Sequence, residues 1–185
     1  MNSSVVSARD LSAATLGGAV AGIGVGLLAR LVMRAVAIVR HVPTELSFFG
    51  SAGVVFTFAV MALGLATTFM WWRRGRLSGG GWPVAQWSMT GVALFAAVVL
   101  LTPLRQELAE PAELLLFVPV ALLLGAVPAW LSQVFRRALP EARSKPVRVG
   151  YRALAVPSIV ATILLPLMLA GGVLQILGLI PVPAN

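Results

Sequence analysis

The chain has 185 residues, of which 59% are hydrophobic and only 11% are charged. A soluble domain usually carries about a quarter charged residues, so this chain has too little polar material to cover a water-soluble fold of its size. The net charge of +8 does not indicate a nucleic-acid partner, because the basic residues lie in short segments between apolar runs, the pattern that orients membrane proteins.

Five apolar runs follow one another along the sequence. They cover residues 11–39, 46–72, 84–102, 114–135 and 153–180. Each could form a spanning helix of about 20 residues, and in lipid a spanning segment must satisfy its own backbone hydrogen bonds. The sequence therefore predicts one all-α integral membrane domain over residues 1–185, a bundle of about five transmembrane helices. The last run contains Pro157 and Pro166, which leaves open whether that helix is continuous.

The first run contains a row of glycines. Gly18, Gly22 and Gly26 recur every fourth residue, and residues four apart lie on nearly the same face of a helix. Glycine allows a second backbone to approach closely, as in the small-residue contacts of membrane helices. The row predicts a packing face that is buried against another helix, in the same chain or in a second copy. Within the chain, residues 50–53 and 170–172 are candidate partners.

The same row continues to Arg30 and Arg34. A helix over 11–39 is about 43 Å long, whereas the hydrocarbon layer is about 30 Å thick, so a centred helix places Arg30 in the outer half of the membrane. Arginine at that depth costs several kcal/mol on an order-of-magnitude view unless it snorkels or pairs. Three interpretations stay open: an anchor to lipid phosphates, a network with outer carboxylates, or a site for an anionic solute, ion or lipid headgroup. The outer carboxylates are Glu45, which is nearest in sequence, Glu107, Glu110 and Glu113.

The basic residues divide unevenly between the two sides of the predicted bundle. With the N-terminus in the cytoplasm, ten of the fourteen lie inside and four outside, and the positive-inside rule favours this orientation. The C-terminus is then outside. Residues 73–81 and 136–152 become cytoplasmic basic segments that can meet anionic headgroups or, for the second, a cytoplasmic partner. Short loops and the absence of cysteine lead us to expect a bacterial plasma membrane.

Few side chains could carry chemistry. Cysteine is absent, His41 is the sole histidine, and Asp10, the sole aspartate, lies before the predicted first helix. This inventory argues against zinc or copper, and no phosphate loop or dinucleotide motif occurs. We expect no catalytic residue, no metal and no cofactor.

Two functions follow as hypotheses. The leading one is a non-enzymatic accessory subunit of a larger membrane complex, or a homo-oligomer packed through the glycine face. The alternative is a small transporter or channel that handles an anionic solute or lipid headgroup at Arg30 and Arg34, with Glu45 nearby.

Overall fold

The computed structural model describes residues 7–41, 48–75, 83–101, 111–141 and 144–176, and every regular element within them is a helix. The helices are α1 (Ala8–Val39), α2 (Phe48–Gly75), α3 (Pro83–Leu101), α5 (Pro111–Ala138) and α6 (Lys145–Ile176). Four of them, α1, α2, α5 and α6, contain segments long and apolar enough to cross a membrane. The described part is therefore all-helical, and its helices are those of a membrane-spanning protein.

The first four helices begin and end within three residues of the predicted runs, but α6 differs. It begins at Lys145 instead of residue 153 and continues without a break through Pro157 and Pro166. The prediction from apolar runs missed the first two turns of α6. An apolar run marks where a helix enters the lipid, whereas the backbone hydrogen bonds of the helix begin before that point. The segment 136–152 is consequently mostly helix.

Local capping explains both ends of α1. The Ser7 Oγ accepts a hydrogen bond from the Asp10 backbone N–H (3.2 Å) and donates one to Asp10 Oδ2 (2.7 Å). Asp10 thus lies in the first turn, where the helix dipole favours a negative charge. At the other end, His41 follows Arg40 with a φ of 56°, the left-handed conformation that ends many helices. The expectation that Asp10 precedes the first helix is therefore wrong.

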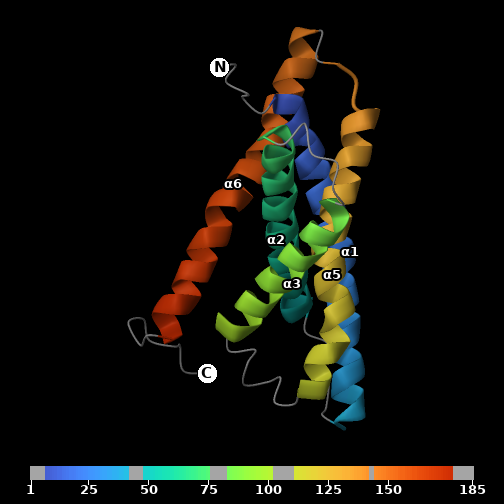
Figure 1. Cartoon of the computed structure of the whole chain (residues 1–185), viewed down its shortest axis with the longest axis vertical. Helices are drawn as coiled ribbons and strands as arrows, with labels where there is room; N and C mark the ends of the chain where they lie inside the picture. Colours follow the sequence, from blue (N-terminus) through green and yellow to red (C-terminus); the bar gives the residue numbers. More distant parts are fainter. Residues whose placement is uncertain (1–6, 42–47, 76–82, 102–110, 142–143, 177–185) are drawn as a thin grey trace.

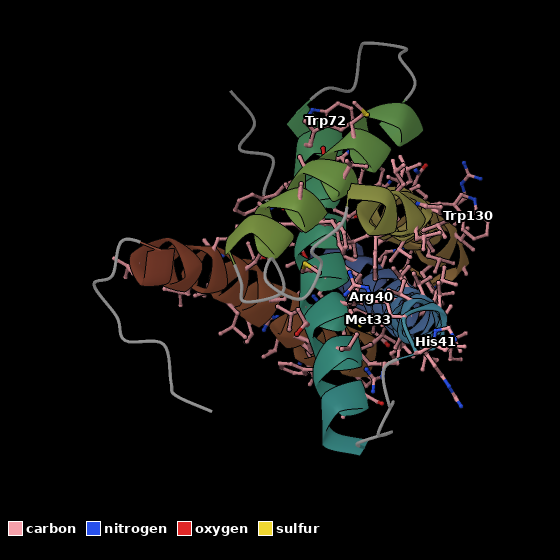
Figure 2. All side chains as sticks on the ribbon, turned by 90° about the horizontal axis from the view of Figure 1, so that it is seen from below. Met33, Arg40, His41, Trp72 and Trp130 are labelled. Carbon is pink, nitrogen blue, oxygen red and sulfur yellow. The ribbon has the colours of Figure 1, made fainter. Side chains whose placement is uncertain are left out.

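Successive helices run in opposite directions, so the start of α1 and the end of α6 lie at opposite ends of the bundle (Figure 1). Helix α1 is central: it packs most extensively against α2 and α5, and also against α6. Helix α3 packs mainly against α5. Helix α6 starts beside α1 and diverges from it towards its own C-terminal end (Figures 1 and 2).

Small residues and aromatic rings fill the spaces between the helices. Trp87 of α3 packs edge-on against Phe69 and Trp72 of α2, with ring centroids 5.4 and 6.0 Å away. Helix α3 crosses α5 at Gly91 and Gly125, where a β-carbon on either glycine would overlap backbone of the other helix. These contacts bring α3 into the bundle by close backbone approach.

The exterior is aliphatic. Large side chains that are more than half exposed include Leu27, Leu31, Leu115, Ile163 and Leu167. A water-soluble protein rarely exposes a contiguous apolar surface of this kind, whereas lipid tails solvate it without cost.

Candidate functional site

The glycine row of α1 faces α2 in a regular register. The two helices are antiparallel, and every fourth residue of α1 contacts every fourth residue of α2. The contacting pairs are Gly18–Leu63, Gly22–Ala59, Gly26–Val55 and Arg30–Ser51. A β-carbon on Gly18 would lie 2.8 Å from Leu63 Cα, and one on Gly26 would lie 2.9 Å from Val55 Cα. The missing side chains therefore set the distance between the two backbones, because real β-carbons do not approach other atoms so closely.

This face is covered within the chain itself. The expected partner segments, residues 50–53 and 170–172, are not where the glycines pack, since their neighbours lie between Val55 and Leu63. Gly53 has open space around its missing side chain. The adjacent Gly17 faces α5, where a β-carbon would come within 2.8 Å of Ser132 Oγ. A second copy of the protein could use the glycine row only by displacing α2.

Arg30 is half-buried and turns towards α2, where its Nε donates a hydrogen bond to Ser51 Oγ at 3.1 Å. Arg34, one turn further along α1, is exposed. Glu45 lies outside the described residues, as do Glu107 and Glu110. Of the residues predicted to form a polar site, Arg30 is therefore the one that the structure shows bonded to α2, through the hydroxyl group of Ser51.

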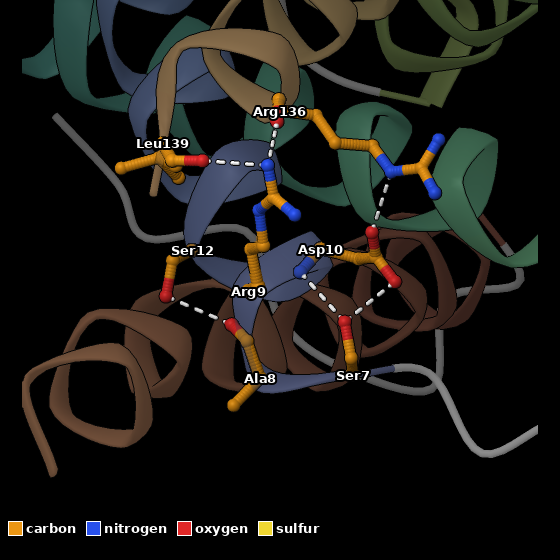
Figure 3. A network of polar contacts seen from close by, with 7 residues as sticks. All are labelled: Ser7, Ala8, Arg9, Asp10, Ser12, Arg136 and Leu139. Atoms are coloured by element: carbon orange, nitrogen blue, oxygen red, sulfur yellow. Dashed lines mark hydrogen bonds and ion pairs between the residues drawn. The ribbon is translucent and has the colours of Figure 1, made fainter. Parts of the chain in front are cut away.

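Sequence reasoning missed a second polar site at the opposite end of α1, which we call the polar clamp and define as Arg9, Asp10 and Arg136 (Figure 3). The Asp10 carboxylate accepts a hydrogen bond from the Arg136 Nε at 2.7 Å; the Asp10 side chain is 5% exposed and that of Arg136 is 40% exposed. The Arg9 Nη2 donates to the carbonyl oxygens of Arg136 (2.9 Å) and Leu139 (2.6 Å). Arg9 therefore satisfies carbonyls at the end of α5 that have no partner within the helix.

Hydroxyl groups next to the clamp join α1 to α6. The Ser12 Oγ lies 2.8 Å from the Tyr151 carbonyl oxygen, and Thr15 Oγ1 lies 2.7 Å from Ser158 Oγ. The Tyr151 hydroxyl donates to the Pro140 carbonyl at 2.7 Å, which fastens the connection after α5 onto α6. Together with the clamp, these bonds hold the start of α1, the end of α5 and the first half of α6 at one level.

A local signal for this site does exist in the sequence. Ser7 and Asp10 have the spacing of a helix-capping box, which places Asp10 inside the helix, and Ser12 and Thr15 follow on neighbouring turns. The partners Arg136, Tyr151 and Ser158 carry no such signal, because their pairing depends on how distant helices pack.

Most polar side-chain contacts in the described part join two helices or bond a side chain to the backbone of its own helix. In these ranges no three histidine, cysteine, aspartate or glutamate side chains lie close enough to hold a metal ion. His41 is exposed at the end of α1 (Figure 2), and its Nδ1 lies 3.1 Å from the Val39 carbonyl oxygen, so it contributes to the local turn.

Comparison with known proteins gives no relative: no family model, no curated protein and no solved structure matches the chain.

Proposed function

We propose that the chain is a non-enzymatic membrane protein that crosses the bilayer five times and serves as an accessory subunit of a larger membrane complex. One observation supports this most: the fully buried polar residues of the described part are engaged in helix contacts. Each bonds to another helix or to its own helix backbone, and they are Asp10, Ser12, Thr15, Thr67, Ser132 and Ser158. The partly buried Arg9, whose Nε has no hydrogen-bond partner among the described residues, bonds to the end of α5 through its Nη2. A site for catalysis or ion relay would need ionisable groups that face a substrate or a cavity instead.

The fifth span in this proposal is α3. Its 19 residues give a length of about 28 Å at 1.5 Å per residue, close to the hydrocarbon thickness of about 30 Å. Its packing against α5 through Gly91 and Gly125 is typical of helices that associate in lipid.

Two groups of polar contacts, at different heights along the bundle, support a particular depth of the bundle in the membrane. The polar clamp marks one level at Asp10, and the Arg30–Ser51 bond marks the other. The helical rise from Asp10 to Arg30 is about 30 Å, which equals the thickness of the hydrocarbon layer. We therefore place the clamp at one boundary and Arg30 at the other, where its guanidinium can reach lipid phosphates.

The orientation follows from charge. The clamp end carries the start of α1, the ends of α2 and α5 and the start of α6. Eight of the ten basic residues that the positive-inside rule assigns to the cytoplasm belong to these described helix ends. We propose that this end is cytoplasmic, that the C-terminus is outside, and that the membrane is a bacterial plasma membrane.

The accessory-subunit form of the proposal is favoured over a homo-oligomer built on the glycine face, because α2 already covers Gly18, Gly22 and Gly26. The exposed surfaces that a partner protein could bind are mainly aliphatic. Figure 2 shows Trp130 on the outer side of α5, away from the other helices, and this ring is 58% exposed.

A second candidate function rests on the Arg30–Ser51 bond. This bond holds one guanidinium at the proposed outer boundary, with the exposed Arg34 one turn away. Two arginines on one helix face suit an anionic solute or a lipid headgroup. If the purified protein carried an anionic solute into liposomes and the Arg30→Ala variant did not, a transporter would be favoured over an accessory subunit.

The accessory-subunit proposal is tested by photo-crosslinking in native membranes. A photoreactive residue is placed at the exposed positions Leu27, Leu116 and Ile163 in turn, and at the buried Phe69 as the control. We expect one exposed position to capture a different protein in good yield, identified by mass spectrometry, and Phe69 to react within the chain. Capture of only lipid, or only a second copy of this chain, at all exposed positions would contradict the proposal.

A further inference from the structure

One face of α6 changes character along its length. Lys145, Arg148 and Arg152 lie in its first turns, and their spacings of three and four residues put them on one side of the helix. The same side continues with branched aliphatic residues in the later turns, namely Val156, Ile159, Ile163 and Leu167. All these cationic and aliphatic side chains are exposed. We call this side the cation–aliphatic face.

The cation–aliphatic face lies beside the side of α6 that contacts the other helices. Those contacts use a neighbouring side of the helix, where Tyr151, Ala155 and Ser158 are buried and Ser158 bonds to α1. Helix α6 diverges from α1 towards its C-terminal end (Figure 1), and the aliphatic side chains of this face are exposed, whereas Leu165, on another side of the helix, packs against Gly64 of α2. Within the described part of the chain no helix covers this face, so a lipid can occupy it.

The cationic and aliphatic residues of this face follow one another along the helix as the headgroup and the acyl chains do in a phospholipid. The Ser12–Tyr151 bond puts Arg152 at the level of the polar clamp, and Arg148 lies about 6 Å further along the helix axis. With the clamp at the hydrocarbon boundary, as proposed above, and a headgroup layer about 5–8 Å thick on each side of the bilayer, both guanidiniums lie at phosphate depth. The aliphatic turns from Val156 onward lie at the depth of the acyl chains.

We propose that the cation–aliphatic face of α6 binds one anionic phospholipid, with its phosphate at Arg148 and Arg152 and an acyl chain along Val156, Ile159 and Ile163. Two guanidiniums favour a lipid of net negative charge over a zwitterionic one, whose own cationic group they repel. Lys145 adds to the attraction from beyond the headgroup layer. This site rests on the proposed position of the polar clamp at the membrane boundary. It does not depend on the accessory role or on the orientation, because it takes the same lipid in either leaflet.

The test measures lipid preference in the full chain. Purified protein in neutral detergent is titrated with phosphatidylglycerol or phosphatidylcholine, and the bound lipid is counted by native mass spectrometry. Each cation near the phosphate is worth roughly fivefold in affinity. We expect phosphatidylglycerol to bind at least about tenfold tighter than phosphatidylcholine, and Arg148→Gln with Arg152→Gln to remove most of that difference.

Two further variants make the result specific. Arg40→Gln removes a charge from the exposed far end of α1, outside both proposed anion sites, and should leave the preference unchanged. Arg148→Lys with Arg152→Lys keeps the charge and should retain most of it. The proposal fails if the Arg148 and Arg152 glutamine variant keeps the wild-type preference, if wild type shows none, or if the far-end variant loses it equally.

A second measurement needs no variant at all. A phosphatidylglycerol with a photoreactive acyl chain is cross-linked to the wild-type protein, and the modified peptide is identified by mass spectrometry. Modification of α6 between residues 153 and 167, competed by unlabelled phosphatidylglycerol and not by phosphatidylcholine, is the expected result. Modification spread evenly over all helices, without competition, would show only general lipid contact and would overturn the site.

Discussion

Gly22 of α1 lies against the backbone of Ala59 on α2, with no room for a β-carbon between them. The two helices touch here through main chain, and Gly18 and Gly26 extend the same contact by one turn in each direction. This close approach is what lets the Arg30 side chain reach Ser51 at the end of the row.

Replacing Gly22 by alanine should therefore separate α1 from α2. The new methyl group meets backbone that cannot move aside, and overpacking of this kind costs about 1–3 kcal/mol. We expect a lower thermal unfolding temperature and a lower yield of monodisperse protein, measured by fluorescence-detected size-exclusion chromatography after heating. Gly24→Ala is the matched control, because its missing side chain has open space and alanine favours the helix. Equal loss in both variants would contradict the role of Gly22.

Asp10 and Arg136 should show coupled effects on stability. Asp10→Asn leaves the Arg136 guanidinium without its charged partner, and a hydrogen bond to a charged group contributes about 1.5–3 kcal/mol where it is buried. Because Arg136 is partly exposed and thus screened by solvent, we expect about 1 kcal/mol from Arg136→Gln. A double-mutant cycle on the midpoint of denaturation should give a smaller loss for the double variant than the sum of the two single losses. Strict additivity would show that the ion pair contributes no stability of its own.

Arg30 and Arg34 should differ although both belong to the same row. Arg30→Ala removes the bond to Ser51 and the packing of its aliphatic stem, with an expected cost of about 1 kcal/mol. Ser51→Ala should act in the same direction. The exposed Arg34 serves as the control, and Arg34→Ala should leave the unfolding temperature nearly unchanged. If both arginine variants unfolded at the wild-type temperature, Arg30 would have no structural role.

The proposed orientation can be read directly, because the chain has no cysteine of its own. A single cysteine at Ser144, between α5 and α6, should resist a membrane-impermeant maleimide in intact cells and react after lysis. A cysteine at His41, after α1, should react in intact cells. Both positions are exposed, so they form a matched pair, and the reverse labelling would mean an inverted topology.

The sequence by itself determined the helices and one packing face. The hydrocarbon thickness sets how long an apolar run must be, and the helical period puts Gly18, Gly22 and Gly26 on one side. Both are local properties, readable from neighbouring residues alone. Locality also explains the error at α6, whose basic first turns at Lys145 carry no apolar signal although they are helical.

Only the tertiary structure decided which surfaces meet. The glycine row packs on the residues around Ala59 because α2 returns antiparallel to α1 in a register that the row itself does not encode. The bond between Asp10 and Arg136 joins residues 126 positions apart. Such a pair forms because three helices converge at one end of the bundle, where an acid taken out of solvent needs a charged partner.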